Sequence, residues 1–299
     1  MTVDASAVTR FGGDEVAPCT FADARIVVLP LCYEGAVSYG SGCRDGALAL
    51  LTASGQMERL DERTLSPWAD CGIHTMAPCR PAGRPREAVA EMAAAAERVL
   101  SAGKRLLSLG GDHAVSNGPI AAAARRFPGM AVVQVDAHLD LRDTWNGSRF
   151  NHACVMRRAS ADLGLDVLPI GIRSVAPEER DVLEDCNIVP VYAHEIHDAG
   201  HRWLDRIRDR LPETVYLTID VDGLDPAVMP GTGTPEPGGL DYRQLLALIA
   251  LLGRHTRVVA ADIVELVKIP GNQVSEYTAA RIAQKIITHC WNEGVSAED

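Results

Sequence analysis

The stretch 132-VVQVDAHLDLRD-143 starts as an apolar strand and ends in acid. Side chains of a strand alternate between two faces, so Asp136, His138 and Asp140 point the same way if the strand continues through them. Two carboxylates on one buried face repel each other, and burying them unpaired is costly. Two interpretations follow: a solvated strand end, or a site where a bound cation offsets the repulsion.

Two further apolar stretches end in potential metal ligands. The stretch 215-VYLTIDVDGLDP-226 places Asp220 and Asp222 on predicted strand residues before a turn, and 105-RLLSLGGDH-113 ends in His113. In open α/β sheets, ligands bind outside the carboxyl ends of the strands. This recurrence favours cation binding and predicts one shared site at that edge of a sheet.

Strand-like and helix-like stretches alternate along the chain. Helical patterns include the alanine-rich segment 86–100 and the segment 275–291, which we predict to begin with Ser275 as its N-cap. Such alternation predicts an α/β fold with a mostly parallel, doubly wound sheet of about eight strands. The predicted strands are 25–31, 70–76, 105–109, 131–136, 166–171, 188–191, 215–220 and 257–262.

Composition limits the class of protein. The 299 residues are 47% hydrophobic and show no linker, so we expect a single domain over 1–299, with 1–24 as an irregular N-terminal arm. A net charge of −11 disfavours nucleic acid as a partner and suits a small cationic molecule. Without an apolar signal region, a membrane-length apolar run or a C-x-x-C motif, we expect a cytoplasmic protein that binds no membrane.

The candidate ligands also indicate which metal would bind. Four carboxylates and two imidazoles exceed the needs of one catalytic zinc ion. They suit two divalent ions of the magnesium or manganese type, bridged by carboxylates, which together can lower the pKa of a shared water. The predicted metal ligands are His113, Asp136, His138, Asp140, Asp220 and Asp222.

Other motifs indicate less specific roles. The glycine-rich stretch 230-PGTGTPEPGG-239 lacks the lysine of a phosphate-binding loop and carries Glu236, which would repel phosphate. His194, His197 and His201 are typical of a polar helix face. Cys154, although beside a histidine, is more typical of a small buried residue than of a nucleophile.

The motifs "LGGDH", "DAHLD", "NHACVMRR", "IDVDGLDP", "PGTGTPEPGGL" and "DIVEL" occur in the order found in ureohydrolases. Over nearly its whole length the chain resembles this arginase and agmatinase superfamily, and agmatinases most of all. The resemblance implies an arginase-like three-layer αβα sandwich with a mostly parallel eight-stranded sheet. It also implies two Mn²⁺ ions per chain and a homo-oligomer, either a trimer or a hexamer.

The same resemblance assigns roles to the site residues. Asp136 and Asp220 would bridge the two ions; His113 and Asp140 would complete one site, and His138 and Asp222 the other. Asp140 and His152 would transfer protons, and Glu265 would bind the guanidinium. Thr234 and Asn151 would contact the substrate.

The implied reaction is hydrolysis of agmatine to putrescine and urea by a metal-bridging hydroxide. Arginine is disfavoured, because Ser174 and Ala176 replace the aspartates that hold its amino-acid head group in arginases. Arg142 or Arg149 in the tail pocket would instead favour an acidic substrate, so 4-guanidinobutyrate is an alternative. A zinc deacylase on the same fold is a more distant one.

Overall fold

Eight strands form one sheet in the order β2-β1-β3-β8-β7-β4-β5-β6, and every pair of neighbours is parallel. This confirms the predicted eight-stranded α/β fold. The structure, a computed structural model, describes residues 9–200 and 202–292. The strands are β1 (Ile26–Pro30), β2 (Ile73–Thr75), β3 (Arg105–Leu109), β4 (Ala131–Val135), β5 (Val167–Ile172), β6 (Val191–Tyr192), β7 (Thr214–Asp220) and β8 (Arg257–Val264).

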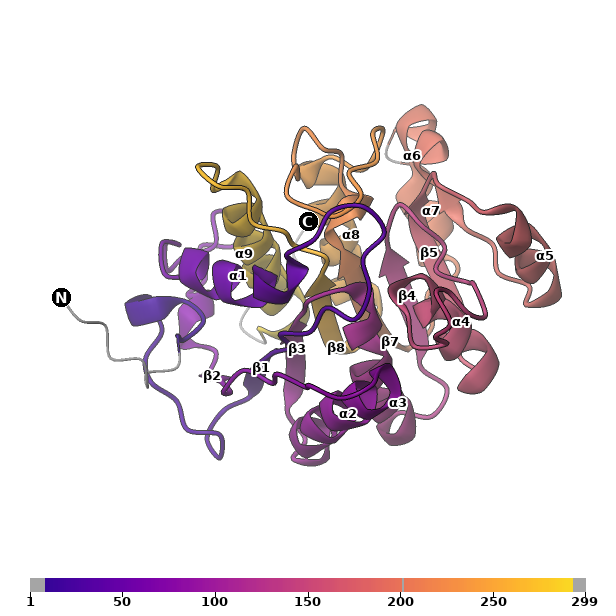
Figure 1. Cartoon of the computed structure of the whole chain (residues 1–299). Helices are drawn as coiled ribbons and strands as arrows, with labels where there is room; N and C mark the ends of the chain where they lie inside the picture. The colour runs from indigo at the N-terminus through magenta and orange to yellow at the C-terminus, as the bar shows by residue number, and fades with distance from the viewer. Residues whose placement is uncertain (1–8, 201, 293–299) are drawn as a thin grey trace.

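Helices cover both faces of the sheet, so the fold has three layers (Figure 1). One face packs against α2 (Pro85–Ser101), α3 (Asn117–Arg126), α4 (Val155–Arg157) and α5 (Pro177–Asp185). The other face packs against α1 (Gly46–Ser54), α6 (Ala193–Ala199), α7 (Arg202–Arg208), α8 (Tyr242–His255) and α9 (Val274–Ile286). No helix among the described residues is long and apolar enough to cross a membrane.

The strand sequences are apolar because both of their faces are buried. In β7, Leu217 and Ile219 belong to the apolar cluster beneath α8 and α9, whereas Tyr216 belongs to the cluster on the opposite face. The N-terminal stretch also contributes to the core. Phe11 is fully buried and packs edge-on against Trp68.

Capping residues set the ends of the longer helices. Asp241 Oδ1 accepts a hydrogen bond from Gln244 N at 2.7 Å and thereby begins α8. The prediction that Ser275 caps the last helix is wrong. Asn272 Oδ1 accepts from the first helical N–H, at Val274, while the Ser275 hydroxyl accepts from Gly231 N at 2.8 Å. Ser275 therefore holds the loop after β7 in place.

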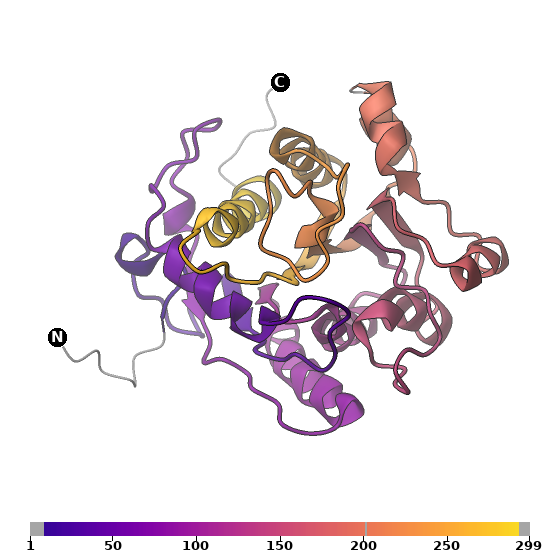
Figure 2. The same cartoon turned by 45° about the horizontal axis from the view of Figure 1, so that its top comes forward.

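The sheet register brings four chain segments to one edge. Strands β3, β8, β7 and β4 are consecutive neighbours, and Asp220 pairs with Val264 while Ile219 pairs with Val135. The carboxyl ends of these strands therefore lie side by side, and the residues that follow them leave the sheet at the same edge. Figure 2 brings this edge forward and shows the indigo loop after β1, the pink loop after β4 and the orange loop after β7 around it.

Candidate active site

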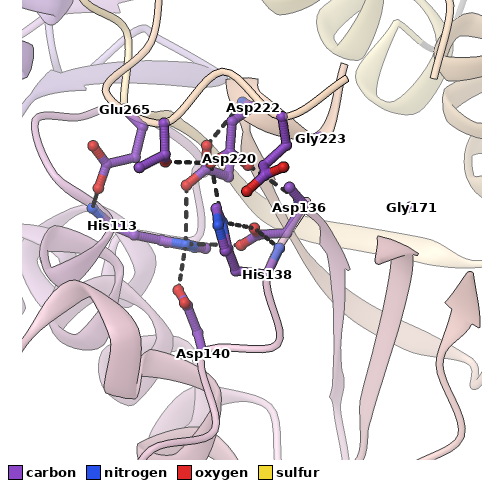
Figure 3. Close-up of polar contacts among 12 residues, drawn as sticks. His113, Asp136, His138, Asp140, Gly171, Asp220, Asp222, Gly223 and Glu265 are labelled. Atoms are coloured by element: carbon purple, nitrogen blue, oxygen red, sulfur yellow. Dashed lines mark hydrogen bonds and ion pairs between the residues drawn. The ribbon is translucent and has the colours of Figure 1, made fainter. Parts of the chain in front are cut away.

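The six predicted metal ligands converge at this edge (Figure 3). His113 Nδ1 lies 3.0 Å from Asp140 Oδ2, 3.2 Å from Asp136 Oδ2 and 3.4 Å from Asp220 Oδ2. His138 Nδ1 lies 3.1 Å from Asp222 Oδ2 and 3.5 Å from Asp136 Oδ1. Asp136 therefore faces both imidazoles, and its fully buried side chain lies between two potential cation sites.

A turn, and not the alternation of a continuing strand, brings Asp136, His138 and Asp140 together. Strand β4 ends at Val135, so the alternation of a continuing strand does not align Asp136, His138 and Asp140. Instead, the His138 N–H folds back onto Asp136 Oδ1 at 2.6 Å, and Asp140 adopts a left-handed φ of 53°. A non-glycine residue in that region is strained and is often found at functional sites.

The ligands after β7 are also placed by a turn. Asp222 lies in a 3₁₀ turn and not on the strand, and its N–H donates to Asp220 Oδ1 at 2.9 Å. Gly223 lets this turn approach the end of β4, because a Cβ there would lie 2.8 Å from Asp136 N. Asp222 Oδ1 then accepts a hydrogen bond from Ala137 N at 3.1 Å, which ties the two ligand loops together.

The grouped carboxylates repel one another and would be stabilised by a nearby positive charge. Burial, followed by repulsion from Asp136, raises the pKa of Asp140 to about 7. Burial, followed by repulsion from Asp222 and Asp136, raises the pKa of Asp220 well above its usual range. A cation among them would remove that repulsion, since opposite charge favours the ionised carboxylate.

The hydrogen bonds behind His113 suit a metal ligand. Thr218 donates its hydroxyl proton to Asp262 Oδ1 at 2.6 Å, so its oxygen can only accept from His113 Nε2–H, at 2.9 Å. Nδ1 then carries a lone pair that faces three carboxylates, and this buried atom has no hydrogen-bond partner. A lone pair aimed at oxygens fits a bound cation, and such a backing hydrogen bond is usual for metal-binding histidines.

We predict that Thr218→Val weakens metal binding about 10- to 100-fold, because Nε2–H would lose its acceptor and the ring its orientation. Titration of the metal-free protein with Mn²⁺ measures the change. Thr218→Ser keeps the hydroxyl and is the matched control, with affinity close to that of the unmodified chain. Equal affinities for the valine and serine variants would show that this hydrogen bond does not orient His113.

Glu265 adds a further carboxylate beside the ligands. It follows β8 with a left-handed φ of 63°, and its Oε1 accepts from His113 N at 2.7 Å. Burial, followed by repulsion from Asp112, raises its pKa well above the usual range. A guanidinium bound to this carboxylate would reverse that shift through charge-assisted hydrogen bonds.

A cavity of about 360 Å³ opens above the cluster. The predicted site residues on its wall are His113, His138, Asp140, His152, Asp220, Asp222, Thr234 and Glu265. Thr234 also donates to Asp222 Oδ2 at 3.0 Å. Asn151 is buried outside the wall, where its Oδ1 accepts from Ala153 N at 3.1 Å. Asn151 therefore shapes the turn beside His152, and its contact with substrate stays a prediction.

His152 contacts a residue that the sequence motifs did not single out. Its Nε2 lies 2.9 Å from the hydroxyl oxygen of Ser38, in the loop after β1. Asp112 Oδ2 holds that loop by accepting from Gly35 N at 2.7 Å. Burial lowers the pKa of His152 below its usual value. The imidazole is therefore neutral at pH 7.

Arg173 is a second residue that sequence reasoning missed. Its guanidinium donates to the carbonyl oxygens of Asp222 and Glu236, both at 2.6 Å, and of Gly171 at 3.0 Å. It therefore fixes the turn that carries Asp222 and the adjacent loop that carries Thr234. The only signal for this role was an arginine at the end of an apolar strand.

The cysteine and histidines of the remaining motifs do not line the cavity where the structure describes them. Cys154 is fully buried, and burial raises its pKa to about 12, so it fits the predicted packing role. His194 stacks on Tyr192, and His197 Nε2 lies 3.1 Å from Gly239 O. The predicted His201 lies outside the described residues.

Sequence comparison identifies the family. The sequence model of the arginase family matches residues 24–289. The chain belongs to the arginase family. An arginase-family relative from Synechocystis sp., an N(1)-aminopropylagmatine ureohydrolase, is 40% identical over 92% of this chain and 91% of its own. An agmatinase from Pyrococcus horikoshii is 32% identical, with 88% and 89% covered. The predicted superfamily is thus confirmed, and the chain is a ureohydrolase-type enzyme.

Solved structures of the arginase family share the fold. The agmatine ureohydrolase of Thermoplasma volcanium superimposes with a TM-score of 0.86, at 27% identity, over 96% of this chain and 95% of that one. The proclavaminate amidino hydrolase of Streptomyces clavuligerus gives 0.83 at 27% identity, over 89% and 92%.

Proposed function

We propose that the chain is a binuclear manganese ureohydrolase that releases urea from agmatine. The observation that carries the proposal is that His113 and His138 each face Asp136 beneath a cavity that Glu265 also lines. His113 with Asp140 and His138 with Asp222 would complete two cation sites, and Asp220 lies beside the first. Mixed oxygen and imidazole ligands suit Mn²⁺.

The chain's own residues would bind and orient the substrate. Glu265 would hold the planar guanidinium by charge-assisted hydrogen bonds and so turn its central carbon toward the ligand cluster. The two cations, when bound, would supply a water activated as the nucleophile at neutral pH. Asp140 lies on the cavity wall, where its carboxylate can pass a proton to the leaving amine. Neutral His152 can take up a proton and carry it outward.

The cavity wall favours a cationic tail on the substrate. Arg142, considered a partner for an acidic tail, lies 3.3 Å from Glu178 Oε1, so its charge is already compensated. Arg149 lies off the wall and pairs with Asp162 at 3.0 Å. These contacts favour agmatine over 4-guanidinobutyrate. The names of the relatives make N(1)-aminopropylagmatine a second candidate.

We predict that arginine is a poor substrate, with kcat/KM at least about tenfold below that of agmatine. Ser174 and Ala176 line the cavity and offer no carboxylate to the α-ammonium group, which would lose its water without gaining a partner. Urea release from agmatine, N(1)-aminopropylagmatine, 4-guanidinobutyrate and arginine, measured with Mn²⁺, tests this. Fastest cleavage of arginine would contradict our interpretation of residues 171–179, and no urea from any of the four would overturn the proposed function.

A further inference from the structure

A cation already lies against an aromatic ring at the cavity wall. The Arg142 guanidinium carbon is 3.7 Å from the centre of the Trp145 ring, and both residues line the cavity. The same guanidinium lies 3.3 Å from Glu178 Oε1. An aromatic face and a carboxylate are the two groups that hold ammonium or guanidinium ions most readily.

The Trp145 ring is carried by a rigid turn. Trp145 and Ser148 exchange two backbone hydrogen bonds of 3.0 Å, and the intervening Asn146 and Gly147 have φ values of 49° and 76°. This is the pairing that a tight two-residue Asn-Gly hairpin requires. Nearby, the buried Arg158 pairs with Asp143. These contacts hold the backbone that carries Trp145, and none of them involves Arg142.

Arg142 can be displaced from this position. The Glu178 side chain is 56% exposed, and an ion pair at such exposure contributes little to stability. The neighbouring carboxylate of Glu179 is not available to a ligand, because its two oxygens accept from Leu141 N and Ala176 N, both at 2.9 Å. Glu178 does not itself line the cavity, but it is the carboxylate that Arg142 reaches from the wall, and an incoming cation that took the place of the guanidinium would reach it too.

We propose that Trp145 and Glu178 form a subsite for a second positive charge in the substrate's tail, which Arg142 occupies when the tail does not reach it. This inference rests on the proposed function and extends it. Glu265 would hold the guanidinium at one end of the cavity, and the subsite would bind an ammonium group farther along. An N(1)-aminopropyl arm supplies such an additional amine, so the enzyme would prefer N(1)-aminopropylagmatine to agmatine.

The test is the ratio of kcat/KM for N(1)-aminopropylagmatine to kcat/KM for agmatine. Trp145→Leu and Glu178→Gln should each lower this ratio about three- to thirtyfold, because they remove the ring face or the negative charge. Arg142→Gln should raise the ratio, because it removes the internal competitor. Arg149→Gln is the matched arginine control, since Arg149 lies off the cavity wall, and should leave the ratio unchanged.

Two outcomes would overturn the subsite. One is a ratio that stays within about twofold of the unmodified enzyme in both Trp145→Leu and Glu178→Gln. The other is an Arg142→Gln variant whose ratio falls, which would make Arg142 itself a substrate contact. Glu178 is exposed, so its variant remains informative if Trp145→Leu does not fold. Failure of the unmodified enzyme to release urea from either substrate would instead overturn the proposed function.

Discussion

Asp136→Ala is expected to bind neither metal ion tightly and to release urea on the order of a thousandfold more slowly, or worse. Among the residues that the structure describes, Asp136 is the one carboxylate that faces both imidazoles, with its oxygens 3.2 Å from His113 Nδ1 and 3.5 Å from His138 Nδ1. Removing it would take a ligand from both cation sites at once. It would also leave Gln134 Nε2 without the oxygen to which it donates at 2.8 Å.

Metal content per chain, measured after dialysis against Mn²⁺, tests this directly. The unmodified enzyme should retain two ions and Asp136→Ala none. Asp185→Ala is a suitable control, because Asp185 is an exposed aspartate at the end of α5 and does not line the cavity. Two retained ions in the Asp136 variant would contradict the bridging role, whatever its activity.

The sheet could be predicted from sequence because both of its faces are buried. Uninterrupted apolar stretches such as β4 and β7 occur where helices cover both sides, and the polar residue after each stretch then marks the functional edge. The sequence placed Asp136, Asp220 and His113 at this edge in the same way, and the structure brings their side chains together there. The short edge strand β6 was placed less well, at 188–191 in place of Val191–Tyr192, because few apolar residues define it.

Residues placed by loops could not be predicted from periodicity. Asp140 reaches the cluster through a left-handed backbone and not through strand alternation. Ser38 lies among glycines and serines, where nothing in the pattern indicates which hydroxyl will meet His152. Thr218 and Asp262 offered a usable signal, because a polar side chain inside an apolar strand must find a buried partner.

His152→Ala is expected to keep both metal ions and to lose about 10²- to 10⁴-fold in kcat, the usual range for a general acid or base. Its imidazole lines the cavity but is not among the groups that could hold a cation. Burial lowers its pKa below the usual value, so the imidazole is neutral at pH 7 and carries a lone pair that can accept a proton. This function is separate from metal binding, so metal content and kcat should respond differently.

The matched variant for His152 is Ser38→Ala, which removes only the hydroxyl that lies 2.9 Å from Nε2. If Ser38 merely orients His152, Ser38→Ala should lower kcat by roughly tenfold at most, which is less than the loss in His152→Ala. Added imidazole should then restore part of the rate in His152→Ala, which lacks the ring. It should restore none in Ser38→Ala, which still has the His152 imidazole. An unchanged kcat for His152→Ala at saturating substrate would remove His152 from the mechanism. Loss of metal from His152→Ala would instead show that His152 helps to hold the metal site together.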